Sequence, residues 1–201
     1  KLYLDEMTTI KKTVNQYDVL VAEAIDLKKV GHNSLYEHFL QTPYMKIEAL
    51  DYTMEIIRDF YPDYYDCART YMYGPVFYPY NMFIMSKKVF SEYSEWLFGI
   101  LEKLCEKLDM TDYSIQSRRV PAHIGERLLG VYITYLKENR KELKIKELQV
   151  GFIHNTNMQE TISHIQSFNT CLSNAIFRTT IGNNMKFAVI ERAIPTYPIK
   201  K

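Results

Sequence analysis

The sequence predicts an α/β fold in which helices outnumber strands. Three short apolar segments, at residues 17–24, 81–85 and 144–153, have the length and composition typical of buried strands. Longer segments between them repeat apolar residues every three or four positions, which is the pattern of amphipathic helices. Strands that are separated by helices in this way indicate an α/β domain rather than an all-helical bundle.

The sequence of the first half of the chain predicts three helices, of which the last is short. Residues 5–16 have helix-compatible composition, and after the strand at 17–24 the residues 27–34 are expected to form a loop. Pro43 is expected to open the next helix, because proline suits a first helical turn. That helix ends at the Tyr61-Pro62 boundary, and a short helix is expected to begin at Pro62.

The second half contains the strongest helical pattern of the chain, at residues 87–109. Pro121 is expected to begin another helix before the strand at 144–153. After Asn155 the pattern weakens into a helix-compatible stretch and then a last strand or helix. We therefore expect one domain over residues 1–154 and a C-terminal extension of unknown role over residues 155–201.

Composition excludes several classes of function. The net charge of +1, from 25 basic and 24 acidic residues, gives no reason to expect nucleic-acid binding. No run approaches the roughly 20 apolar residues of a membrane span, and the N-terminus lacks a signal-peptide core, so a cytoplasmic protein is expected. No glycine-rich phosphate loop is present. Cys67, Cys105 and Cys171 form no CxxC pair and are expected to be reduced and largely buried.

The segment QSRRVPAHIGERLL, at residues 116–129, carries the strongest candidate chemistry. Glu126 near a helix start would be held ionised, as suits a general base that removes a hydroxyl proton. His123 could orient a partner. Three arginines could chelate a phosphate or diphosphate with two-pronged geometry: Arg118, Arg119 and Arg127. The alternative is structural, with Glu126 and Arg127 forming a salt bridge.

The tyrosine-rich stretch YMYGPVFYPYNMFIM, at residues 71–85, surrounds a Gly-Pro turn. Its rings either pack in the core or form a platform on which a sugar stacks. Tyr78 and Tyr80 are the better platform candidates because they precede the expected strand, and the Asn81 amide must bond either backbone or a substrate hydroxyl. The histidines have no metal-binding spacing, and His38 is retained as a further substrate-site candidate.

Four short motifs give the chain a resemblance to a known family. They are Asn-Met-Phe-Ile-Met at 81–85, Tyr-x-x-Trp-Leu-Phe at 93–98, Gln116 followed by Arg119-Val120, and Glu-Arg-Leu-Leu at 126–129. In this order and spacing they resemble a bacterial family of capsular and exopolysaccharide biosynthesis proteins, long catalogued as a domain of unknown function and regarded as glycosyltransferase-like. The resemblance covers about residues 17–150 and matches the C-terminal two-thirds of the family pattern.

The resemblance implies a GT-A-like glycosyltransferase fold, with a short central sheet flanked by helices. It implies transfer of a sugar from a nucleotide-sugar donor to a growing capsular or exopolysaccharide glycan. Family members carry an earlier part with nucleotide-binding strands, so the chain is expected to be a fragment or a truncated relative that is inactive alone. No Asp-x-Asp pair is present, so a divalent metal stays open without a ligand motif.

Within this interpretation, Asn81 and the neighbouring tyrosines contact sugar while Glu126 acts as base or orients the acceptor hydroxyl. Arg119 and Arg127 balance the charge of the leaving diphosphate. The alternative function is a non-catalytic glycan-binding or assembly module of a polysaccharide-synthesis complex. Peripheral association with the inner face of the membrane has little support, because the long helix around Trp96 has mixed charge.

Overall fold

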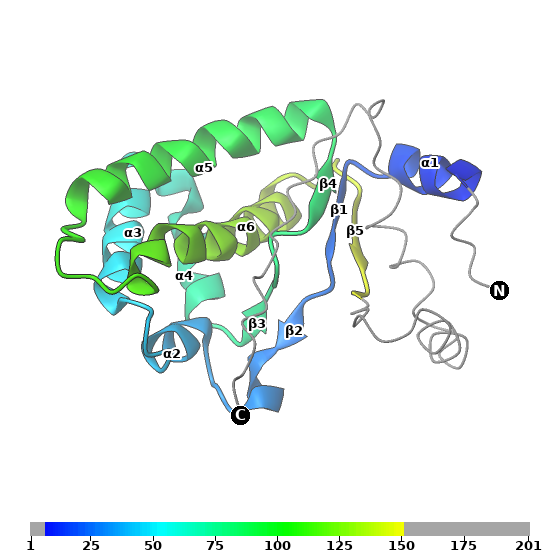
Figure 1. The fold of residues 1–201 in the computed structure, drawn as a ribbon. Helices are drawn as coiled ribbons and strands as arrows, with labels where there is room; N and C mark the ends of the chain where they lie inside the picture. Colours follow the sequence, from blue (N-terminus) through cyan, green and yellow to red (C-terminus); the bar gives the residue numbers. More distant parts are fainter. Residues whose placement is uncertain (1–6, 151–201) are drawn as a thin grey trace.

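A helical layer packs against one side of a small three-stranded sheet (Figure 1). The computed structural model describes residues 7–150. The elements in chain order are α1 (Met7–Gln16), β1 (Val19–Ala22), β2 (Ile25–Asp26), α2 (Leu35–Leu40), α3 (Ile47–Phe60), α4 (Tyr65–Met72), β3 (Val76–Phe77), β4 (Phe83–Met85), α5 (Lys87–Lys107), α6 (Val120–Asn139) and β5 (Ile145–Leu148). Three 3-10 turns join them, at Leu27–Val30, Pro62–Tyr64 and Ser117–Arg119.

Strand β1 is the centre of the sheet, whose order is β4-β1-β5. It runs antiparallel to β4, with Leu20 opposite Ile84, and parallel to β5, with Leu20 opposite Lys146. All four residues of β1 are buried, which explains its continuous apolar sequence. A separate two-stranded ribbon pairs β2 with β3 and leads the chain towards β4.

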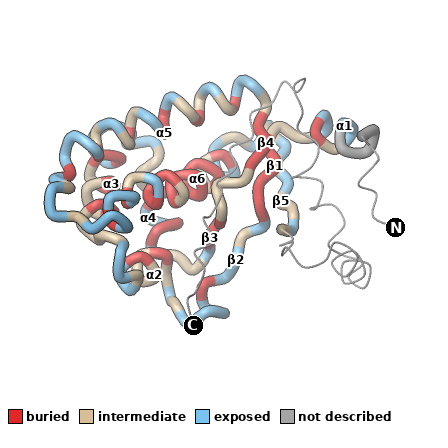
Figure 2. The backbone as a smooth tube through the Cα atoms, viewed as in Figure 1, coloured by how far each residue is buried: buried red, intermediate tan, exposed pale blue. Residues whose placement is uncertain are grey.

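Helix α6 is the buried centre of the helical layer and packs on α4, α5 and α3 (Figure 2). Aromatic side chains fill the space between these helices. The Tyr64 ring stacks on Tyr135 with centroids 4.0 Å apart, and it lies 4.9 Å from Trp96. Tyr71 is 3% exposed. For these tyrosines the structural interpretation of the aromatic cluster is therefore correct.

The helix-rich α/β fold with small sheets is confirmed. The strands expected at 17–24, 81–85 and 144–153 correspond to β1, β4 and β5, although each is shorter than its apolar segment. The longest expected helix, at 87–109, corresponds to α5. The helix expected from Pro121 begins one residue earlier, at Val120.

One local expectation is wrong, and one helix was not predicted. Pro43 does not open a helix, because it lies in a turn closed by the Met45 N–H and the Thr42 carbonyl at 3.0 Å. Helix α2 was not expected, although Ser34 accepts a hydrogen bond from the Glu37 N–H at 3.1 Å and caps it. The sequence signal for α2 was present as a Ser34-x-x-Glu37 capping box.

The expectation for the cysteines is only partly correct. Cys67 is buried, but Cys105 is exposed on α5. Cys171 and the expectations for the stretch after Asn155 lie outside the described residues.

Glu147 of β5 ties the sheet to the helical layer. Its Oε1 accepts hydrogen bonds from Lys137 of α6 at 2.5 Å and from the Tyr78 hydroxyl at 2.8 Å, and its Oε2 accepts one from the Ala24 N–H at 3.1 Å. Burial acts to raise the pKa of Glu147, but these hydrogen bonds outweigh it and lower the pKa below its ordinary value.

Replacing Glu147 with glutamine is expected to destabilise the fold by about 1 kcal/mol at neutral pH. Because the folded pKa is lowered, the carboxylate contributes its stability above the unfolded pKa and loses it as pH falls through the folded value. Urea unfolding of wild type and Glu147→Gln should therefore give curves that converge in acid. If the free energies of unfolding of the two proteins differ by the same amount at pH values below the folded pKa, the Glu147 carboxylate does not stabilise the fold in this way.

Candidate functional site

The chain enters β4 through a turn with unusual backbone geometry. Tyr80 has φ of 76° and Asn81 has φ of 48°. In residues 7–150 they are the non-glycine residues with positive φ. Asparagine tolerates this left-handed conformation, whereas a bulky tyrosine adopts it rarely. Such strain persists only where the surrounding contacts hold it, and it is frequent at functional sites.

Glu126 of α6 makes one of the contacts that stabilise the turn at Tyr80 and Asn81. Its Oε1 accepts a hydrogen bond from the Tyr80 N–H at 2.9 Å, and its Oε2 accepts one from Arg127 Nη1 at 2.5 Å. The two candidate regions of the sequence, the turn before β4 and the segment 116–129, therefore meet at Glu126. Its side chain is 13% exposed, so the carboxylate is not sealed inside the molecule.

The expected position of Glu126 near the helix start is wrong. Helix α6 begins at Val120, so Glu126 lies beyond its first turn. The influence of a helix dipole falls off within that turn. Glu126 is held by the Tyr80 N–H and by Arg127 instead.

Arg127 is a buried cation, with 2% of its side chain exposed. Its guanidinium lies over the rings of Phe77 and Phe39, at 5.1 and 5.6 Å from their centroids, and its Nη1 also donates to the His123 carbonyl at 3.2 Å. Burial lowers the pKa of Arg127, and the charge of Glu126 opposes this shift. The guanidinium therefore pairs with Glu126 and is not exposed for the two-pronged phosphate contact expected from sequence.

His38 of α2 also lies near the Phe77 ring. Its ring centroid is 6.0 Å from that of Phe77 and 4.9 Å from that of His32. Burial lowers the pKa of His38, the charges of Arg127 and His32 lower it further, and the charge of Glu126 partly opposes them. His38 is therefore neutral at pH 7 and within electrostatic range of the Glu126–Arg127 pair.

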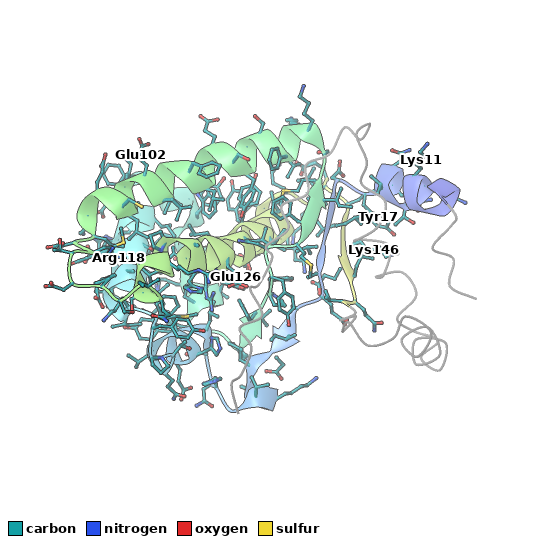
Figure 3. The ribbon with its side chains drawn as sticks, viewed as in Figure 1. Lys11, Tyr17, Glu102, Arg118, Glu126 and Lys146 are labelled. Atoms are coloured by element: carbon teal, nitrogen blue, oxygen red, sulfur yellow. The ribbon has the colours of Figure 1, made fainter. Side chains whose placement is uncertain are left out.

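The remaining candidates lie apart from Glu126 or inside the fold. Arg118 is exposed, and its Nε donates to the Tyr113 carbonyl at 3.2 Å; Figure 3 shows it well away from Glu126. Arg119 is also exposed, at the end of the 3-10 turn before α6. His123 is 8% exposed, with its ring 5.6 Å from that of Tyr44.

Tyr78 has no exposed ring face in this structure on which a sugar could stack. It is 4% exposed, its N–H donates to the Tyr71 hydroxyl at 3.0 Å, and its own hydroxyl donates to Glu147. Burial and the contact with Glu147 raise its pKa. These contacts give Tyr78 a structural role, and of the two platform candidates only Tyr80 is partly exposed.

Three residues of the site were not anticipated from sequence: Phe39, Phe77 and His32. The two phenylalanines face Arg127 from α2 and β3. No periodicity or spacing connects them with Arg127, because the contact exists only once three distant segments have packed together. A surface hollow of about 340 Å³ lies elsewhere, between α3 and α5, where it is lined by Phe60, Lys103 and other residues that were not candidates.

Two negative findings concern residues 7–150. No group of three or more His, Cys, Asp or Glu side chains there is arranged to hold a metal ion. In the same residues, no helix has the length and apolar character that crossing a membrane requires.

A comparison with solved structures shows which class of protein has a similar fold. The chain is similar to a solved apo structure of WbbM, a bifunctional glycosyltransferase, with 31% sequence identity and a TM-score of 0.66. The similarity covers 75% of this chain and 28% of the WbbM chain. The fold is therefore glycosyltransferase-like, and the chain spans under a third of that relative.

The family is shown by a second comparison. Residues 3–140 match the model of the family described as "Domain of unknown function (DUF4422)". The chain belongs to this family. No curated protein matches it.

Proposed function

We propose that this chain is part of a glycosyltransferase that moves a sugar from a nucleotide-sugar donor to a growing capsular or exopolysaccharide glycan. The observation that carries the proposal is the hydrogen bond of 2.9 Å between Glu126 and the Tyr80 N–H, which joins a carboxylate to the strained turn of Asn81. The likeness to a bifunctional glycosyltransferase supports the reaction class. Residues 1–154 would form the transferase domain.

Glu126 would act as the base or orienting group for the acceptor. In the reaction, an acceptor hydroxyl oxygen bonds to the anomeric carbon, and the bond from that carbon to the donor phosphate breaks. The nucleoside diphosphate leaves with the bonding electrons, and the hydroxyl proton passes to Glu126. An ionised carboxylate accepts hydrogen bonds at both oxygens, and in Glu126 these oxygens already accept from the Tyr80 N–H and from Arg127, which fixes the orientation of the group.

The leaving diphosphate needs cationic partners. Arg127 is paired with Glu126, whereas Arg118 and Arg119 are exposed before α6. Arg118 and Arg119 therefore remain the candidates of this chain for contact with a phosphate. His123 would act through its carbonyl, which accepts a hydrogen bond from Arg127. Use of a nucleotide-sugar donor would place the reaction in the cytoplasm. The proposal includes contact of the protein with the inner face of the membrane.

Replacing Glu126 with glutamine tests the proposal, because the amide keeps the shape and loses the basic oxygen. In the full-length protein as its gene encodes it, transfer is expected to fall about 10²- to 10⁴-fold. The measurement is release of nucleoside diphosphate from a panel of nucleotide-sugars with oligosaccharide acceptors. Near-wild-type turnover in Glu126→Gln would remove Glu126 from the mechanism.

The matched control is Glu102→Gln on the exposed side of α5, distant from Glu126 in Figure 3. It removes the same charge and should transfer at the wild-type rate. Circular dichroism of both variants separates loss of chemistry from loss of fold. Oligosaccharide binding without any nucleotide-sugar turnover in the wild type would favour the non-catalytic glycan-binding module instead.

A further inference from the structure

We infer that the cluster around Arg127, formed by His32, His38, Asn81, Glu126 and Arg127, binds uncharged sugar hydroxyl groups and not the diphosphate of the donor. This inference rests on the proposed function and names the part of the substrate that the site takes. It also changes the role of Arg127 from a phosphate ligand to a positioning residue for Glu126.

The charge of Arg127 is already balanced by that of Glu126. Arg127 and Glu126 are paired at 2.5 Å, and both are largely buried. The imidazole of His38 is neutral at pH 7 because burial and the charge of Arg127 lower its pKa. A diphosphate placed here would bring at least two negative charges beside a cation that is already paired with a carboxylate, and such burial is costly.

The cluster also contains several buried polar atoms that need partners. Among the residues that the structure describes, four of these atoms have no hydrogen bond: Asn81 Oδ1, His38 Nδ1, His32 Nδ1 and Arg127 Nε. Each such group costs free energy when it stays unsatisfied. Ring contacts connect three of these residues, since His32 contacts His38, His38 contacts Phe77, and Phe77 contacts Arg127. Asn81 joins them through the chain, because the N–H of the preceding Tyr80 donates to Glu126, the partner of Arg127.

The kind of atom distinguishes a hydroxyl from a phosphate. Asn81 Oδ1 can only accept a hydrogen bond, so its partner must be a donor. A diphosphate that is fully ionised offers only acceptors, whereas a sugar hydroxyl donates one bond and accepts others. Hydroxyl groups can therefore satisfy both Asn81 Oδ1 and the donor Arg127 Nε, and a diphosphate cannot.

The test follows the imidazole signals of His38 in an NMR spectrum of the 201-residue chain. The uncharged probes are methyl glycosides of galactose, glucose, mannose and N-acetylglucosamine, and the charged probes are UDP and inorganic pyrophosphate. At least one glycoside should shift the His38 signal, and neither charged probe should. A shift with UDP or pyrophosphate, or none with any glycoside up to its solubility limit, would overturn the inference.

Asn81→Gly is the matching variant, because glycine keeps the positive φ and removes the side chain. We expect glycoside binding about tenfold weaker in Asn81→Gly, the loss of one hydrogen bond. Asn139→Ala, at the exposed end of α6, should bind as the wild type does. Equal binding by Asn81→Gly and wild type would exclude Asn81 from the site and contradict the inference.

Transfer kinetics separate the two possible sources of the hydroxyl groups. If they belong to the acceptor, Asn81→Gly raises the KM for acceptor and leaves that for the donor unchanged; if they belong to the donor sugar, the reverse holds. The NMR result does not depend on turnover. Absence of any nucleotide-sugar turnover in the wild type would therefore refute the proposed function even where glycosides bind, and a UDP-dependent shift would refute the inference alone.

Discussion

Replacing Arg127 with methionine is expected to lower the free energy of unfolding by about 3 kcal/mol. Methionine fills similar space between Phe39 and Phe77 but removes the cation that pairs with Glu126. A largely buried carboxylate without its partner is the main source of the loss. Urea unfolding at neutral pH measures it.

The double variant Arg127→Met with Glu126→Gln is the control for this explanation. It removes both charges, so it should be more stable than Arg127→Met alone. If the two proteins unfold at the same urea concentration, the loss comes from packing and not from the unpaired carboxylate. Wild-type stability in Arg127→Met would contradict the buried ion pair itself.

Replacing Gly130 with alanine is expected to destabilise the protein by about 3 kcal/mol. A Cβ atom on Gly130 would overlap the Tyr71 ring and hydroxyl, well inside van der Waals contact. Tyr71 is 3% exposed and cannot swing away without losing the bond of 3.0 Å from the Tyr78 N–H. Calorimetry or urea unfolding should show the loss.

Gly125→Ala supplies the matched control on the same helix. Its Cβ would meet Leu101 Cδ1 at 3.6 Å, which is ordinary contact. Because alanine favours a helix over glycine by about 1 kcal/mol, this variant should be as stable as wild type or more so. Two glycine variants with equal stability would show that Tyr71 does not fill the space beside Gly130.

Most helices and strands could be predicted because each one leaves a pattern in a short stretch of neighbouring residues. The period of apolar residues in 87–109 identifies α5, and the short apolar run at 81–85 identifies β4. The error at Pro43 arose because proline suits both a helix start and a turn, and only packing selects between them. Similarly, Tyr78 and Tyr80 are two positions apart in sequence, yet one is buried and the other is partly exposed.

The sequence by itself determined that the chain is a helix-rich α/β protein, and it marked Asn81 and Glu126 as residues of interest. Only the tertiary structure decided that these two regions meet and that Arg127 lies against Phe39 and Phe77. It also decided that Arg127 pairs with Glu126 and is not exposed to a phosphate. The physical reason is the separation along the chain over which each interaction acts. Periodicity and turn chemistry act over a few residues, whereas burial and ion pairing depend on which distant segments the core brings into contact.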